Sequence, residues 1–169
     1  LLSERAILVE GATEFILLPK LYEQLTGRTI EKDEVAIIPC GGVSYKRYLA
    51  IAENANKKVS VITDNDGDSD KISEAANYND SHEDQHVFMD QTTEGWTWEK
   101  CFYEANKEAL DSLIEARPKA KYLFHGKDYG PVLGKMLNNK ADVAYQMLTA
   151  EAKFTIPKYV QDAIKWLNE

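Results

Sequence analysis

The chain has 169 residues and a net charge of −8, which is enough for one domain with a real core but not for two. No apolar stretch approaches the roughly 20 residues of a membrane span and nothing resembles a signal peptide, so we expect a cytoplasmic protein with no membrane partner. Two cysteines are too few for a disulfide framework or a zinc site. The chain does not begin with Met, and we expect it to be a piece of a longer protein.

Charge is distributed unevenly along the chain. From Arg117 onward there are nine Lys and Arg against five Asp and Glu, whereas the preceding part is strongly acidic. A free-standing nucleic-acid-binding module has a net basic face, so this distribution does not indicate one. It suits a centre of metal ions and carboxylates that binds an anionic substrate, although surplus acid that only keeps the domain soluble would look the same.

The first half alternates between predicted strands and helices. A strand over 5–9 leads into a helix that runs to Gly27, and Pro19 is expected to bend that helix or shorten its first segment. A strand over 34–39 ends at the turn formers Gly41 and Gly42, after which Ser44 is placed to cap a helix. A third strand over 58–62 is followed by a polar segment, which we expect to be a mobile loop over 72–84, and by a strand over 85–89.

The second half is predicted to be helical. Thr97 leads into one helix, apolar spacing predicts another from Pro131 to about Ala150, and a last one runs over 157–167. The alternation before it argues for an α/β fold with a four-stranded parallel sheet, right-handed crossovers and helices on both faces. We therefore expect a catalytic core over 1–116 and a helical C-terminal extension over 117–169 that packs on it.

Acidic residues follow two of the predicted strands. Asp64 and Asp66 come directly after the third strand, and Glu10 and Glu14 come after the first. Because ligands bind beyond the carboxyl ends of parallel strands, we expect these four carboxylates at one edge of the sheet, where they would form a divalent-metal site. A solvated acidic turn would also explain the aspartates. An EF-hand is excluded, because the glycine and the terminal glutamate of its loop are not at the required positions.

The motifs Val9-Glu10-Gly11-x-Thr13-Glu14 and Val61-Ile62-Thr63-Asp64-Asn65-Asp66-Gly67, with the glycine pair between them, resemble the Toprim domain of the OLD (overcoming lysogenization defect) family of ATP-dependent endonucleases. The resemblance covers the whole chain. It implies a Rossmann-like Toprim fold and a carboxy-terminal nuclease domain that follows an ABC-type ATPase in the full protein. No Walker A sequence is present, so we do not expect this chain to bind ATP.

The resemblance also implies which residues form the site. Two divalent cations, Mg²⁺ or Mn²⁺, would be held by the two glutamates, the Asp-x-Asp pair and a later Ser/Thr-x-Glu element. That element matches Thr97-Trp98-Glu99, although Trp98 stands where relatives usually have leucine and Glu94 is a competing carboxylate. A lysine in the last third completes the family's site. Lys140 fits best and Lys135 is the alternative.

Two bound divalent cations supply what hydrolysis of a DNA phosphodiester needs: an activated water, neutralisation of the phosphate charge, and help for the departing 3′ oxygen. We expect Glu14, Asp64 and Asp66 at one ion and Glu10 and Glu99 at the other. Glu10 could instead act as the general base, and Lys140 would neutralise charge on the phosphate. Alternatives are another Toprim enzyme of the topoisomerase, primase or RNA-processing type, an aspartate-nucleophile phosphatase using Asp64, or a non-catalytic module that docks DNA or forms a homodimer.

Overall fold

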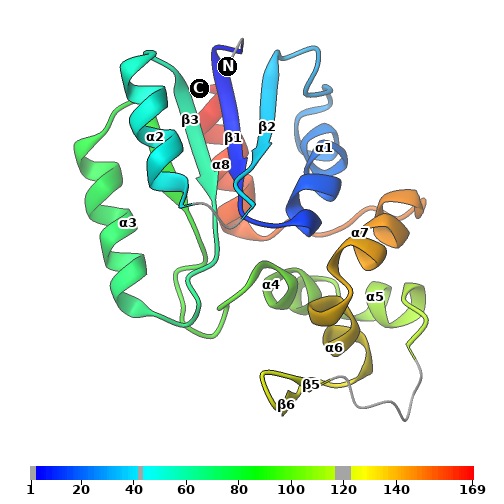
Figure 1. Ribbon diagram of the computed structural model, residues 1–169. Helices are drawn as coiled ribbons and strands as arrows, with labels where there is room; N and C mark the ends of the chain where they lie inside the picture. Colours follow the sequence, from blue (N-terminus) through cyan, green and yellow to red (C-terminus); the bar gives the residue numbers. More distant parts are fainter. Residues whose placement is uncertain (1–2, 42–43, 117–122) are drawn as a thin grey trace.

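The centre of the molecule is a parallel sheet of four strands. A computed structural model describes residues 3–41, 44–116 and 123–169. The strands lie in the order β2-β1-β3-β4, and each pairs in parallel with its neighbours (Figure 1). They are β1 (Arg5–Val9), β2 (Val35–Pro39), β3 (Lys58–Ile62) and β4 (Gln85–Phe88). The predicted sheet is confirmed, with each strand within one residue of its expected ends.

Helices cover both faces of this sheet, as predicted. Alternate residues of β1 divide between two apolar clusters: Ile7 and Val9 face one side, and Ala6 and Leu8 face the other. This period of two is the pattern of a strand buried on both faces. The four covering helices are α1 (Ala12–Thr26) and α8 (Lys158–Asn168) on the first side, and α2 (Tyr45–Asn54) and α3 (Ser69–Ser81) on the second. Helix α1 continues through Pro19.

The prediction of a loop over 72–84 was wrong, because most of that segment is α3. Its composition is polar, and of its residues only Ala75 is fully buried, so the apolar periodicity that identifies a helix is weak. The signal that was present is local: the side chain of Asp68 accepts a hydrogen bond from the Asp70 amide at 2.8 Å, which caps the first turn. Helix α3 therefore begins directly after the acidic turn.

A group of short helices lies beyond the carboxyl ends of the strands, below the sheet in Figure 1. The single helix expected from Pro131 to Ala150 is two helices, which meet at Asn139, and this break places Lys140 at the start of the second. The helix that begins near Thr97 is likewise divided at Asn106. The elements of this group are α4 (Trp98–Ala105), α5 (Lys107–Leu113), β5 (Leu123–Phe124), β6 (Lys127–Asp128), α6 (Pro131–Asn138) and α7 (Lys140–Thr149).

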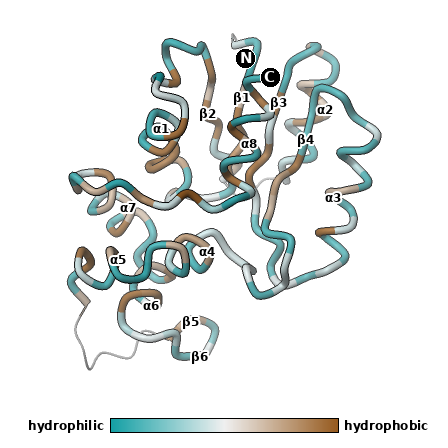
Figure 2. The backbone as a smooth tube through the Cα atoms, turned by 180° about the vertical axis from the view of Figure 1, so that it is seen from behind, coloured by the Kyte–Doolittle hydropathy of each residue, from teal (hydrophilic) through white to brown (hydrophobic). Residues whose placement is uncertain are grey.

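The end of the chain returns to the sheet. Trp166 of α8 stacks on His86 of β4 with ring centroids 4.3 Å apart, and Lys58 of β3 lies over the same indole (Figure 2 shows α8 beside β3). Helix α8 thus supplies a layer of the sheet core, while the division of the chain at residue 117 stays a prediction. The part of the chain that the structure describes contains no helix long and apolar enough to cross a membrane.

Candidate metal centre

Glu10 and Asp64 meet because β1 and β3 are neighbours in register. Val9 pairs with Ile62, so the residues that follow both strands leave the sheet side by side. Glu10 Oε2 accepts hydrogen bonds from the Thr63 hydroxyl at 2.7 Å and from the Asp64 amide at 3.3 Å. The end of the first strand is therefore tied to the start of the Asp-x-Asp turn.

Thr97 joins Asp64 to Glu99. Its Oγ1 lies 2.7 Å from Asp64 Oδ2 and 2.8 Å from Glu99 Oε2, and the Trp98 amide donates to Asp64 Oδ1 at 2.8 Å. A hydroxyl has one proton and cannot donate to two carboxylates at once. Both contacts are satisfied when Asp64 is protonated and donates to Thr97, which in turn donates to Glu99. The structure thus brings the Thr-x-Glu element into contact with the Asp-x-Asp turn.

Glu99 is the best satisfied carboxylate of the group. Its side chain is 1% exposed, and it accepts from Thr13 Oγ1 at 2.8 Å, from Thr97, and from Lys140 Nζ at 3.0 Å. The lysine comes from the first residue of α7, so the break at Asn139 positions it. Lys135, by contrast, donates to the Glu115 carbonyl at 2.9 Å on the exposed side of α6. Of these two lysines, only Lys140 contacts a member of the carboxylate group, by which we mean the cluster of Glu14, Asp64 and Glu99.

Glu14 is buried with an unpartnered carboxyl oxygen. The residue is 3% exposed, and its Oε2 has no hydrogen-bond partner among the described residues. Burial, and then the charges of Glu99 and Asp64, raise the pKa of Glu14 to about 8. Gly11 makes this position possible, because a Cβ atom at residue 11 would lie 2.9 Å from Glu14 Oε2. The Glu-Gly-x-Thr-Glu motif therefore places a carboxyl directly over its own glycine.

Asp66 lies apart from these contacts. The turn after β3 is not extended, because Asp66 has a φ of 54°, and its amide donates to the Trp96 carbonyl at 3.0 Å. The Asp66 side chain is exposed and forms an ion pair with Lys71 of α3. In an extended turn Asp64 and Asp66, two residues apart, would point to the same side; the positive φ of Asp66 rules out that arrangement, and the two aspartates have different partners.

Sequence reasoning missed the residue between the two aspartates. Asn65 is 0% exposed, and its Nδ2 donates to the carbonyls of Asp90 at 2.8 Å and Thr92 at 2.9 Å. Its Oδ1 accepts from the Gly67 amide at 2.8 Å. These bonds fix the Asp-x-Asp turn against the loop that precedes Thr97. An amide at this position was the available signal, since it can donate and accept where aspartate only accepts.

The residues fit oxygen-preferring divalent cations, although they are not arranged as a finished metal site. Among residues 3–41, 44–116 and 123–169, no three His, Cys, Asp or Glu side chains already converge with the geometry of a metal site. Burial raises the pKa of Asp64 to about 7, against the bonds from Thr97 and Trp98 that lower it. The raised pKa values of Glu14 and Asp64 and the nearby Lys140 reduce the repulsion among the metal-free carboxylates, while the unpartnered Glu14 oxygen is open to a ligand. The carboxyl groups are hard oxygen donors, which suit Mg²⁺ and Mn²⁺.

The same pKa values predict how stability depends on pH without metal. The folded-state pKa values of Glu14, about 8, and Asp64, about 7, lie above their unfolded values, so the folded state retains protons that the unfolded state loses. Stability should therefore fall as pH rises from about 5 to 8, by an amount on the order of 4 kcal/mol from Glu14 alone. In EDTA, Glu14→Gln should raise the melting temperature at pH 8 and flatten this slope.

Circular dichroism melts of both proteins from pH 5.5 to 8.5 would measure the effect. Glu115→Gln is a matched control, because it makes the same substitution outside the carboxylate group. If Glu14→Gln instead lowered the melting temperature at pH 8, the Glu14 carboxylate would be stabilising the fold and the assigned cause would be wrong.

Comparisons with known proteins show which fold this chain shares. Residues 1–66 match the family described as "Overcoming lysogenization defect protein-like, TOPRIM domain". No curated protein matches the chain. The C-terminal region of the Burkholderia pseudomallei OLD protein superposes with a TM-score of 0.71 and 15% identity, over 99% of this chain and 98% of that chain. That of the Xanthomonas campestris pv. campestris OLD protein gives a TM-score of 0.67 and 15% identity, over 98% and 95%. The first 66 residues thus match an OLD-like Toprim family model, and the chain as a whole has the fold of the C-terminal regions of OLD proteins.

Proposed function

We propose that this chain is the nuclease domain of an OLD-type protein and hydrolyses DNA phosphodiester bonds with Mg²⁺ or Mn²⁺. The observation that supports it most is the cluster of buried Glu14, buried Glu99 and half-buried Asp64, in which one oxygen has no partner and one lysine is in contact. Buried carboxylates that repel one another are costly unless a ligand neutralises them. A cationic ligand is the simplest reason for these three carboxyl groups to lie together.

Two divalent cations, when bound, would supply an activated water and neutralise the charges on the phosphate and on the departing 3′ oxygen. Glu14, Asp64 and Asp66 would hold one of them, and Glu10 and Glu99, with the Thr97 hydroxyl between Asp64 and Glu99, would hold the other. Asp66 must leave Lys71 to take part. Release of the protons held by Glu14 and Asp64 would accompany binding.

The remaining roles belong to Glu10 and Lys140. Glu10 is exposed at the end of β1, where it accepts from Thr63, so it is placed to orient the attacking water or accept its proton. Lys140 contacts Glu99 and would neutralise charge on the phosphate. DNA is the substrate in this proposal, and an ABC-type ATPase domain of the same full-length protein is the partner.

An aspartate-nucleophile phosphatase agrees less well with the contacts. In that reaction an oxygen of Asp64 would have to attack phosphorus, yet one oxygen lies against the Thr97 hydroxyl and the other accepts from the Trp98 amide. The scheme also leaves Glu14 and Glu99 without a role. Other Toprim reactions and a non-catalytic module would use the same fold, so activity has to be measured.

The test is incubation of supercoiled plasmid with the purified protein and Mg²⁺ or Mn²⁺. We expect nicked or linear DNA with metal and none in EDTA, and none from an Asp64→Asn preparation purified in the same way. Cleavage that persists in EDTA would mean a contaminating nuclease, and metal-dependent cleavage by the variant would exclude Asp64 as a ligand. Mn²⁺ binding without cleavage, in this chain and in the chain joined to its ATPase, would favour the non-catalytic module.

A further inference from the structure

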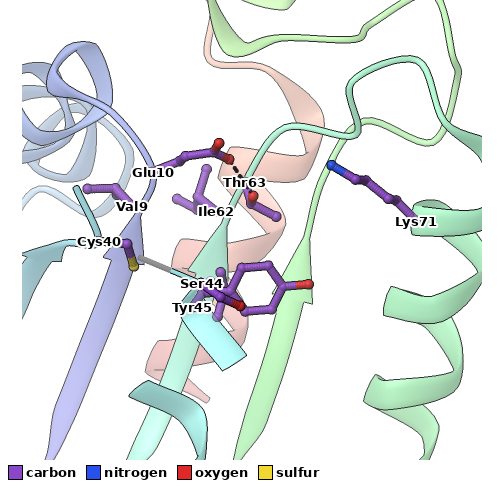
Figure 3. Close-up of a pocket in the computed structure, with 9 residues that line it drawn as sticks. Val9, Glu10, Cys40, Ser44, Tyr45, Ile62, Thr63 and Lys71 are labelled. Atoms are coloured by element: carbon purple, nitrogen blue, oxygen red, sulfur yellow. Dashed lines mark hydrogen bonds between the residues drawn. The ribbon is translucent and has the colours of Figure 1, made fainter. Parts of the chain in front are cut away.

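A crevice lies at the edge of the sheet on the side covered by α2 and α3. It has a volume of about 190 Å³ and opens where β1, β3 and the start of α2 meet. Figure 3 shows Glu10 bonded to Thr63 on one wall and Lys71 reaching over from α3. A second hollow of about 200 Å³ shares Thr63 and Lys71 and extends the crevice past Asp64. The polar lining is Glu10, Cys40, Ser44, Tyr45, Thr63 and Lys71.

Lys71 is the cation of this crevice nearest the Asp-x-Asp turn. It stands in the first turn of α3, and its ammonium group pairs with Asp66. The bond to Asp66 raises the pKa of Lys71, with smaller contributions from the charges of Glu10 and Asp68. About half of the side chain is exposed, so it is free to take another partner. Lys46, also in the second hollow, pairs with Glu74 at 3.2 Å.

The charges in the crevice favour binding of a cation first and binding of an anion only after it. The carboxyl groups of Glu10 and Asp64 face the crevice. The other charges form two ion pairs, Lys71 with Asp66 and Lys46 with Glu74, and each pair has no net charge. A phosphate would be repelled from this metal-free surface. Once Asp66 and Glu10 bind divalent cations, the carboxylate charge is neutralised and the ammonium group of Lys71 loses its partner.

We propose that Lys71 exchanges partners: it neutralises Asp66 in the metal-free protein, and when a divalent cation takes Asp66 it binds a DNA backbone phosphate in the crevice beside Glu10. The proposal rests on the proposed function, and it names a phosphate-binding group and a subsite that lie across the sheet edge from Lys140. It also implies an order of binding, with metal before DNA.

Lys71→Met distinguishes the two contacts of Lys71, with Asp66 and with phosphate, because the variant should change metal affinity and DNA affinity in opposite directions. Without DNA, Mn²⁺ should bind about two- to fivefold more tightly by calorimetry, since an exposed ammonium no longer competes for Asp66. A fluorescent oligonucleotide in Ca²⁺, shown on a gel to stay intact, should bind about tenfold more weakly. In EDTA, the variant and the parent protein should bind it equally.

Lys158→Met is the matched control. Lys158 is exposed on α8, where it pairs with Asp162, so its loss removes one charge and one surface ion pair away from the crevice. It should leave Mn²⁺ affinity unchanged. Unchanged or weaker Mn²⁺ binding by Lys71→Met would overturn the exchange, as would an equal loss of DNA affinity in EDTA. If the parent protein bound no Mn²⁺ at all, the proposed function itself would fail, and the two failures are therefore distinguishable.

Discussion

Asp64→Asn is expected to lower the rate of metal-dependent DNA cleavage by at least about 10³-fold, because a divalent cation contributes several kcal/mol to charge stabilisation and the amide is a poor substitute ligand. In EDTA the same variant should melt at a higher temperature than the parent protein. These two effects have opposite signs, so loss of activity through unfolding is distinguishable from loss of a ligand.

The higher melting temperature follows from the hydrogen bonds of Asp64. An asparagine Oδ1 still accepts from the Trp98 amide, and its Nδ2 donates to Thr97 Oγ1, which then donates to Glu99. The variant keeps each bond of the protonated aspartate and never has to bury a charge near Glu14. Asp64→Ala would leave the Trp98 amide and the Thr97 hydroxyl without partners, and is the poorer choice.

Plasmid cleavage rates and EDTA melts at pH 8 measure both effects. Asp111→Asn, on α5, is the control for loss of one carboxylate charge outside the site. Cleavage by Asp64→Asn within tenfold of the parent rate would remove Asp64 from the metal ligands. A lower melting temperature would show that the Asp64 carboxylate stabilises the metal-free fold, contrary to its raised pKa.

Much of the site could be predicted because it depends on strand ends. Once 5–9 and 58–62 are identified as neighbouring parallel strands, Glu10 and Asp64 must leave the same edge of the sheet. Glu14 follows from the first turn of α1, and Thr97 and Glu99 follow from the family motif. The roles of these residues in metal binding stay predictions, since the contacts show only that the side chains meet.

What the sequence did not reveal depends on local conformation and on tertiary contacts. The positive φ of Asp66 breaks the alternation that an extended turn would have, and Asn65 shows its function only through carbonyls more than 20 residues away. The helix α3 is too polar for its periodicity to identify it, so Lys71 was not considered beside Asp66. The break at Asn139 did carry a helix-stop signal, since two asparagines follow Leu137 and Lys135 lies in the last turn, but apolar spacing that continues across the break favoured a single helix.

The helix break at Asn139 positions Lys140, and loss of this lysine is the second variant for which we expect a large loss of cleavage. Lys140→Met should reduce cleavage by about 10²- to 10³-fold, because removing one preorganised group that stabilises charge in the transition state has that cost. Lys135→Met should stay within about threefold of the parent rate. Both lysines lie in adjacent helices of the same group, yet Lys140 contacts Glu99 at 3.0 Å while Lys135 contacts only the Glu115 carbonyl. The pair therefore tests position with the chemistry of the substitution held constant.

Stability has to be read beside activity, since Lys140 also counters the charge of a buried carboxylate. Its loss leaves Glu99 with two neutral donors, so Lys140→Met should melt at a lower temperature in EDTA, and saturating Mn²⁺ should restore most of the difference. Cleavage is therefore compared in Mn²⁺ at a temperature where both variants are folded. Equal rates for the two variants would mean that Lys140 serves only to neutralise Glu99. A larger loss for Lys135→Met would place the DNA on α6, away from the carboxylates.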